Sequence, residues 1–344
     1  MNSLQISLLL AGGVTLLLVV AYNHWISRKS APRQADKVER DQVEGLPPRE
    51  PTEPHEPELQ DEFQSLPQPE RKPVLDALID AMATIEVDQP VSGDAALAAL
   101  PATRRIGTKP FHVEGCSELT GEWEPLMAGR RYSAFQAGVQ LANRMGPLNE
   151  IEYSEFVVKT QAFADAVGGT PALQEMLEEV ARARELDQFA SAHDAQLSLT
   201  LVTRQAAWSP GYIHQHAARL GFVAGVIPGR MVVPAAVQGM PPLLSLTFDA
   251  QAAMADDPAL SAVRECVLSL DVPQVPRLEQ PFVRLQQAAQ ALAQQMDGLI
   301  TDGAGQVLAE QVMQQIGLDL EHLYDALDQR ELSAGSLQAR RLFS

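Results

Sequence analysis

Apolar residues recur with two different periods along residues 104–332, and the periods predict both strands and helices. Alternation of apolar and polar residues predicts half-buried strands, and recurrence every three or four residues predicts amphipathic helices. The predicted strands cover 109–115, 131–143, 196–203, 231–234, 243–248 and 265–272, with a short hairpin over 299–308. The predicted helices cover 152–167, 171–192, 211–220, 281–296 and 309–329. This order is typical of an α+β fold, an antiparallel sheet with helices packed on one face.

The same succession of predicted elements occurs twice in the chain, and we call this similarity the internal echo. A strand, a helix and a long helix over 131–192 parallel the same succession over 265–329. Two explanations stay open. The chain contains a degenerate repeat, or two stretches share a common β-α order without common ancestry.

An uninterrupted apolar stretch precedes all of this. No charged side chain occurs in residues 1–27, and a helix over 4–26 would span about 33 Å at 1.5 Å per residue, enough for a bilayer core of about 30 Å. Arg28, Lys29 and Arg33 follow at once, so the positive-inside rule predicts a short periplasmic N-terminus and a cytoplasmic remainder. The alternative is a cleaved signal peptide, but the basic start and small-residue cleavage site that it needs are not visible.

Residues 28–103 read as an acidic, proline-rich cytoplasmic linker. Five prolines interleaved with glutamates over 47–58 cannot form a core and favour an extended, solvated spacer that holds a domain away from the bilayer. Within this linker, apolar residues at helical spacing over 74–82 suggest a short docking helix or a transient helix. Folded structure is predicted to start near Arg104 and to end near residue 332, before a loose tail over 333–344.

Charge and cysteine content limit the function. The formal net charge of −18 argues against nucleic acid, because phosphate binding needs clustered lysines and arginines. The two cysteines form no disulfide framework, which suits a reducing compartment. Catalysis has little support, because no nucleophile elbow, phosphate-binding loop or paired-cysteine motif occurs, and His214 and His216 are poor joint metal ligands. We therefore predict no enzyme, no cofactor, no metal and no small-molecule substrate.

Six local motifs carry a resemblance to a known family. In chain order they are LSLTLV, GYIHQHAARLGF, PLLSLTF, VLSLDVP, FVRLQQAAQALAQQMDG and LITDGAGQVLAEQV, all within residues 195–330. Together with the anchor followed by SRK and the acidic proline-rich linker, they resemble the ZipA family of bacterial cell-division proteins, which tie FtsZ to the inner membrane. Residues 104–194 fall outside the matched part and form an α/β extension of the globular region.

The resemblance implies a divisome adaptor that binds the C-terminal peptide of FtsZ on the helix-free face of the sheet over 195–332. Carried over strand by strand, the peptide-binding residues are expected to be Ser198, Thr200, Met231, Val233, Thr247, Val267 and Ser269. Several large apolar residues of the family's groove stand here as serine, threonine, glutamine or aspartate.

That departure keeps other interpretations open. One is that this face of the sheet is an ordinary solvated surface that binds nothing. In addition, an error of one residue in the predicted strand phase would place every assigned residue on the opposite face. The alternative function is a membrane-anchored scaffold that binds a different division or envelope protein through residues 104–194. A membrane-tethered hydrolase is a third, more distant alternative.

Overall fold

The fold is a mixture of helices and antiparallel sheets arranged in two compact units. The computed structural model describes residues 32–34, 74–237, 239–255, 257 and 260–344. The N-terminal unit comprises residues 74–191 with Ser344, and the C-terminal unit comprises residues 192–343 together with 32–34. No helix among these described residues has the length and apolar character to cross a membrane. The predicted anchor over 1–27 lies outside them.

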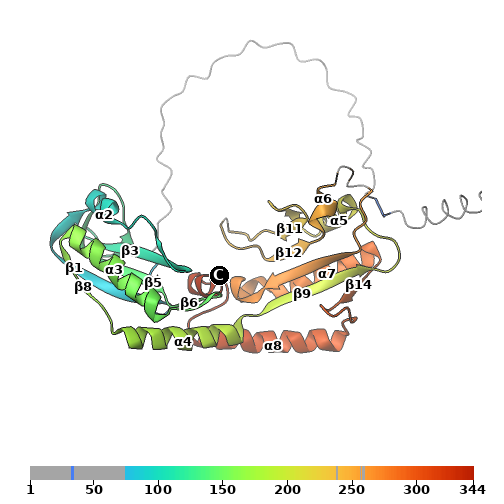
Figure 1. Cartoon of the computed structure of the whole chain (residues 1–344). Helices are drawn as coiled ribbons and strands as arrows, with labels where there is room; N and C mark the ends of the chain where they lie inside the picture. The colour runs from blue at the N-terminus through green and yellow to red at the C-terminus, as the bar shows by residue number, and fades with distance from the viewer. Residues whose placement is uncertain (1–31, 35–73, 238, 256, 258–259) are drawn as a thin grey trace, which may run out of the picture. The chain divides into compact units, whose positions relative to one another are not determined.

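The N-terminal unit has one main sheet in the order β2-β3-β5-β1-β8, with β4 paired to β3 and a small β6-β7 hairpin beside it (Figure 1). Its elements in chain order are β1 (Asp80–Ser92), α2 (Gly93–Ala99), β2 (Arg105–Ile106), β3 (Lys109–Ser117), β4 (Trp123–Pro125), β5 (Arg131–Gln140), β6 (Ala142–Asn143), β7 (Gly146–Pro147), α3 (Glu150–Val167), β8 (Gly169–Ala172) and α4 (Met176–His193).

The start of this unit corrects the predicted linker. The linker was expected to reach residue 103 with a short helix over 74–82, but β1 begins at Asp80 and lies within the sheet between β5 and β8. Ala81, Ala83 and Ile85 are buried at every second position, which is the period of a strand. Val74, Leu75, Leu78, Ile79 and Met82 are three or four residues apart or adjacent, so the stretch that leads into β1 matched a helical period and the alternation that follows it was missed.

Aromatic residues build the core between α3 and the sheet. The Phe135 ring on β5 meets the Phe163 ring of α3 edge-on with centroids 5.4 Å apart, and Phe111 on β3 meets Phe156 in the same way at 6.1 Å. Asn149 starts α3 with a complete capping box, and Gly168 ends it in the left-handed region at φ 68°. The predicted end of this helix at residue 167 is confirmed, whereas Pro171, the first residue of the next predicted helix, lies in the edge strand β8, where a missing N–H is tolerated.

The C-terminal unit has a six-stranded sheet in the order β10-β11-β12-β13-β9-β14, and every pair in it is antiparallel. Its elements in chain order are β9 (Gln196–Thr203), α5 (Pro210–Ala218), β10 (Val223–Ala224), β11 (Arg230–Val233), β12 (Leu244–Thr247), α6 (Ala250–Ala253), β13 (Glu265–Asp271), the 3-10 turns η1 (Val272–Gln274) and η2 (Arg277–Glu279), α7 (Pro281–Met296), β14 (Gly298–Thr301), α8 (Glu310–Gln329) and α9 (Leu337–Leu342).

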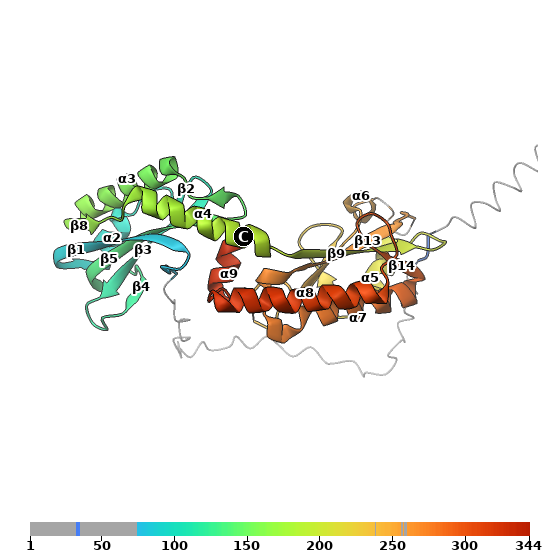
Figure 2. The same cartoon turned by 90° about the horizontal axis from the view of Figure 1, so that it is seen from below.

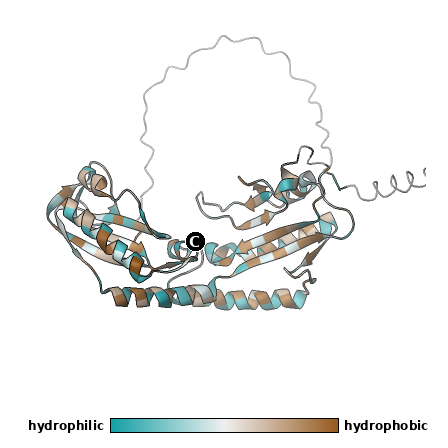
Figure 3. Ribbon diagram, in the orientation of Figure 1, coloured by the Kyte–Doolittle hydropathy of each residue, from teal (hydrophilic) through white to brown (hydrophobic). Residues whose placement is uncertain are grey.

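The core of this unit lies between the sheet and α7. Leucines alternate along β9 and β13, and their buried members face α7, which buries Leu285, Leu292 and Met296 in return. Helix α8 runs beside α7 (Figure 2) and buries one stripe of its surface; the mixture of hydrophobic and hydrophilic positions along it is visible in Figure 3. Among the described residues, the helices therefore leave the opposite face of the sheet uncovered.

The two units share one connectivity. In each, the first strand lies between the last long strand before the main helix (α3 or α7) and the short strand after that helix, giving β5-β1-β8 in one unit and β13-β9-β14 in the other. In each, a short helix follows the first strand, and a long helix follows the last. The echo between 131–192 and 265–329 therefore corresponds to the same β-α-β-α succession, and the correspondence extends back to β1 and β9.

The C-terminal tail corrects a further prediction. Residues 333–344 were expected to be loose, but Ser336 caps α9 and the tail's apolar Leu342 and Phe343 are fully buried. Gln274 donates from Nε2 to the carbonyl oxygens of Arg340 and Phe343, at 3.2 and 2.6 Å. Apolar residues separated by polar ones in so short a segment gave no period to read.

Candidate functional site

Two rows of side chains cross the helix-free face of the C-terminal sheet. The register pairs Ser198 with Ser269, Ser269 with Ser245 and Ser245 with Val232, which makes one row across β9, β13, β12 and β11. The second row is Thr200, Val267, Thr247 and Arg230. No member of either row is buried, so within the described part of the chain this face is accessible.

The structure brings five of the seven predicted residues together on this face. They are Ser198, Thr200, Thr247, Val267 and Ser269. Met231 and Val233 are corrected: they pair with the buried Leu246 and Leu244 and belong to the opposite face, where Met231 is only 2% exposed. The run Met231-Val232-Val233 is apolar throughout, so its alternation gave no phase, and the prediction slipped by one residue.

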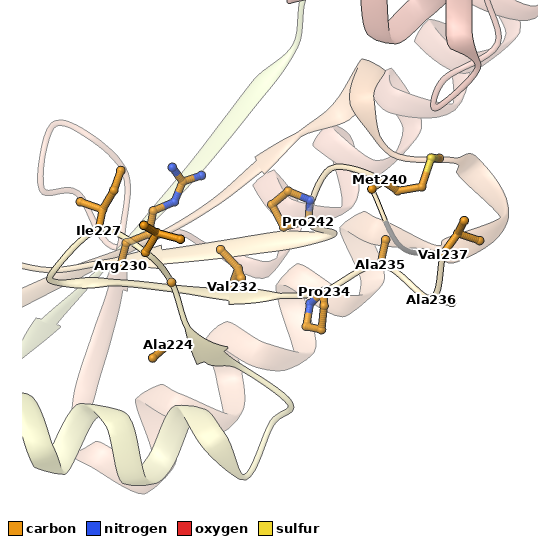
Figure 4. Close-up of a pocket in the computed structure, with 13 residues that line it drawn as sticks. Ala224, Ile227, Arg230, Val232, Pro234, Ala235, Ala236, Val237, Met240 and Pro242 are labelled. Carbon is orange, nitrogen blue, oxygen red and sulfur yellow. The ribbon is translucent and has the colours of Figure 1, made fainter. Parts of the chain in front are cut away.

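The face continues into an apolar pocket beyond β11. The pocket has a volume of about 660 Å³ and is lined from β10, β11 and the connections that follow them (Figure 4). Its lining is Ala224, Gly225, Val226, Ile227, Arg230, Val232, Pro234, Ala235, Ala236, Val237, Gly239, Met240 and Pro242. Ile227 and Arg230 lie at one end and Val237 and Met240 at the other (Figure 4). Val232 belongs to both the first row and the pocket, and sequence reasoning missed it.

Arg230 is the charged residue of this lining. Its Nε atom is buried and has no hydrogen-bond partner in the described part of the chain. A guanidinium can bind a carboxylate through two parallel N–H groups, and an unsatisfied buried donor favours a ligand that accepts from it. Pocket and arginine together suit an apolar group that lies next to a carboxylate or carbonyl oxygen.

A second hollow lies over the other row. It has a volume of about 520 Å³, and its lining includes Thr247, Val267, Phe248 and Glu265. Two hollows on one open face, joined by a surface of serine, threonine and valine, are what an extended segment with spaced apolar side chains requires. A single compact ligand would use one hollow only.

The histidines of α5 have separate surroundings. His214 lies edge-on to Phe248 with ring centroids 5.7 Å apart, and burial lowers its pKa. His216 lies against Tyr212 and pairs its Nδ1 with Gln295 Oε1 at 3.1 Å. Across the ranges that the structure describes, no three His, Cys, Asp or Glu side chains gather as metal ligands.

Comparisons with known proteins give little support to any assignment. No protein-family model matches the chain, and no curated protein matches it. Among solved structures, a monoclinic crystal form of the berberine bridge enzyme from Eschscholzia californica matches with 11% sequence identity and a TM-score of 0.16. The match covers 76% of this chain and 52% of that chain, so this protein spans about half of its length. A likeness of this size carries no argument about fold or function.

One prediction is nevertheless corrected by this finding. The sequence predicted that the chain is not an enzyme, whereas the matched structure is that of an enzyme. The match is too weak to establish that this chain is one. The exclusion of enzymatic activity is therefore withdrawn.

Proposed function

We propose that this protein is a ZipA-like tether of the bacterial divisome, held in the inner membrane through residues 4–26, whose C-terminal unit binds the C-terminal peptide of FtsZ. The observation that carries the proposal is the open helix-free face that runs into an apolar pocket with an unpaired arginine nitrogen. The order of the six motifs over 195–330 supports the choice of the ZipA family.

The energetics of such a face suit a flexible peptide. A buried Val- or Leu-sized side chain contributes about 1.5–3 kcal/mol, so two filled hollows supply several kcal/mol of gross attraction. Ordering a flexible tail opposes this, and micromolar affinity corresponds to about 8 kcal/mol. The serines and threonines between the hollows do not repel a backbone, which can bond to their hydroxyls.

The test is a titration of the full chain in nanodiscs with a fluorescent C-terminal FtsZ peptide, read by anisotropy. The variant Val232→Glu places a carboxylate between the first row and the pocket and is expected to weaken binding tenfold or more. Thr84→Glu is the matched control, because Thr84 is exposed on the sheet of the other unit. Equal affinities for wild-type and Val232→Glu, with unchanged circular dichroism, would reject this face as the binding site.

A second candidate is a scaffold that binds another division or envelope protein through the N-terminal unit. The observation that favours it is a pair of apolar side chains on the outward side of α3, where Ile151 and Val158 are 83% and 67% exposed. This scaffold function would be supported if one division or envelope protein co-purifies with the full chain and no longer co-purifies with the Ile151→Asp variant.

A further inference from the structure

A short stretch far upstream in the sequence is seated on the C-terminal unit. Arg33 pairs with Trp208 as a parallel β-bridge, and Trp208 pairs on its other side with Val263. The Arg33 N–H donates to the Ala207 carbonyl at 2.7 Å, and the Ser209 N–H donates to the Arg33 carbonyl at 2.8 Å. Both backbone groups of Arg33 are thus satisfied by this unit.

The Arg33 side chain reaches the C-terminal end of α7. Its Nη1 donates to the Met296 carbonyl at 3.2 Å, and its Nη2 forms an ion pair with Asp297 Oδ2 at 2.9 Å. A helix C-terminus carries partial negative charge, so a cation is favoured there. Trp208 Nε1 donates to the same Met296 carbonyl at 2.8 Å, which binds the bridge and the helix end into one site.

Residues next to Arg33's partners have the conformation and the size that this contact needs. Asp297 ends α7 in the left-handed region at φ 54°, which aspartate tolerates better than most residues. Gly298 follows without a side chain, and a Cβ there would lie 3.3 Å from both Leu201 and the Trp208 ring. Ser209 caps α5 with its hydroxyl while its N–H holds Arg33.

We propose that Pro32, Arg33 and Gln34 form a clasp that fastens the C-terminal unit to the membrane end of the chain. The proposal rests on the proposed anchor over 4–26. Five residues separate Ser27 from Arg33, and a chain this short reaches at most about 20 Å. The C-terminal unit is then held beside the bilayer, and residues 35–73 join it to the N-terminal unit. Those residues were predicted to be a spacer that holds the whole globular region away from the membrane; with the clasp closed they do not set the distance of the C-terminal unit.

The clasp is tested in full-length protein reconstituted into liposomes. Arg33→Glu places a carboxylate against Asp297, Arg33→Lys keeps the charge but loses the planar fork, and Arg49→Glu matches the charge change elsewhere. Hydrogen exchange of the Ser209 amide reports the contact. Energy transfer from a dye at the exposed Leu278 to labelled lipid reports the distance of the unit from the bilayer.

We expect Arg33→Glu to speed exchange of the Ser209 amide at least tenfold and to lower energy transfer. Arg33→Lys should have a smaller effect, and Arg49→Glu should match wild-type. Unchanged exchange in Arg33→Glu would overturn the clasp, and faster exchange with unchanged energy transfer would overturn its role in setting the distance.

Affinity for the FtsZ peptide, measured on the same samples, separates the two proposals. Loss of the clasp signals with peptide binding retained would count against the clasp alone. Wild-type protein that fails to float with liposomes would overturn the anchor and with it the membrane position of the unit.

Discussion

The two units have the same connectivity, but they differ in how much of the helix-free face of the sheet is covered. In the N-terminal unit, the incoming chain covers part of the helix-free side of the sheet: Leu75 is 9% exposed and lies against Gly138 on β5, whereas Thr84 on β1 stays exposed. In the C-terminal unit, the corresponding rows on β9, β12 and β13 are uncovered and lead into the apolar pocket. Shared topology therefore does not make the two faces equivalent.

One carboxylate holds the cover in place. Glu114 on β3 is 2% exposed, and it accepts hydrogen bonds from the backbone N–H groups of Val74 and Leu75 and, at 2.8 Å, from Gln136 Nε2. The C-terminal unit has hydroxyls at the comparable place, where Ser245 and Ser269 meet at 3.4 Å across β12 and β13. The helix-free face of the N-terminal unit, called the closed face below, thus differs from the open face of the C-terminal unit in a few side chains and in the segment over residues 74–79 that packs on it.

The largest expected difference between the units is their response to alkali. Burial raises the pKa of the Cys266 thiol on β13 from 9.0 to about 12. The unfolded thiol ionises first, so the stability it supports is complete below pH 9 and is lost as pH rises from 9 through 12. Three pKa units correspond to a loss on the order of 4 kcal/mol in the C-terminal unit.

Pulse proteolysis of the full chain across pH 8–12, with fragments identified by mass spectrometry, measures each unit separately. Cys266→Ala should remove the part of the loss that begins near pH 9 and leave the part above pH 10 that Tyr324 contributes, and Cys116→Ala in the other unit should leave the whole loss in place. A C-terminal unit whose pH dependence is the same with and without the Cys266 thiol would contradict this assignment.

The second-largest expected effect is the loss of stability when the segment that covers the closed face of the N-terminal unit is released. Glu114→Ala leaves the donors of Val74, Leu75 and Gln136 without their acceptor, and we expect the N-terminal unit to lose about 3 kcal/mol. Glu118→Ala is the control, because its ion pair with Arg131 is exposed and worth about 0–1 kcal/mol. Urea denaturation followed by hydrogen exchange would show the loss in residues 74–191, and equal effects of the two variants would contradict the role of Glu114.

Adding a methyl group under Leu75 on the closed face is expected to lower the stability of the N-terminal unit by a smaller amount. A Cβ at Gly138 would lie 2.4 Å from Leu75 Cδ2 and 3.4 Å from the Ala81 carbonyl oxygen. Gly138→Ala must displace Leu75, so we expect a loss of about 1–3 kcal/mol in the urea-derived free energy of unfolding. Gly303→Ala is the control, since nothing lies within 4 Å of its added Cβ. A neutral Gly138→Ala would show that Leu75 does not pack there.

The sequence allowed prediction of the elements with a single clear period and failed where a period was masked. Leucines alternating with serine and threonine predicted β9, β12 and β13 and placed five residues on the open face. Three consecutive apolar residues on β11 gave no phase, so Val232 and Arg230 were missed. Helical spacing of the apolar residues over 74–82 hid β1. Arg33 was interpreted only as a charge flanking the anchor, because a contact across more than 170 residues leaves no local pattern.

The smallest expected difference concerns two buried tyrosines. Tyr153 on α3 donates from Oη to the Gln174 carbonyl at 2.5 Å, whereas Oη of Tyr324 on α8 is buried without a partner in the described ranges. Removing a bonded hydroxyl costs about 1 kcal/mol, while removing an unpaired one relieves a desolvation penalty. Tyr153→Phe should therefore destabilise its unit, and Tyr324→Phe should be neutral or stabilising by up to about 1 kcal/mol.

Urea denaturation of both variants at pH 7 measures the contrast, with hydrogen exchange assigning each change to its unit. Burial raises the pKa of Tyr324 from 10.0 to about 12, so its phenol is neutral at pH 7 and the comparison contains no ionisation. Above pH 10 the wild-type unit loses stability as unfolded Tyr324 ionises, and Tyr324→Phe removes that part of the loss. A Tyr324→Phe variant destabilised as much as Tyr153→Phe would mean that the hydroxyl has an acceptor in solution. The pocket of about 600 Å³ that Tyr324 lines with Phe282 and Met313 would then be the place to look for it.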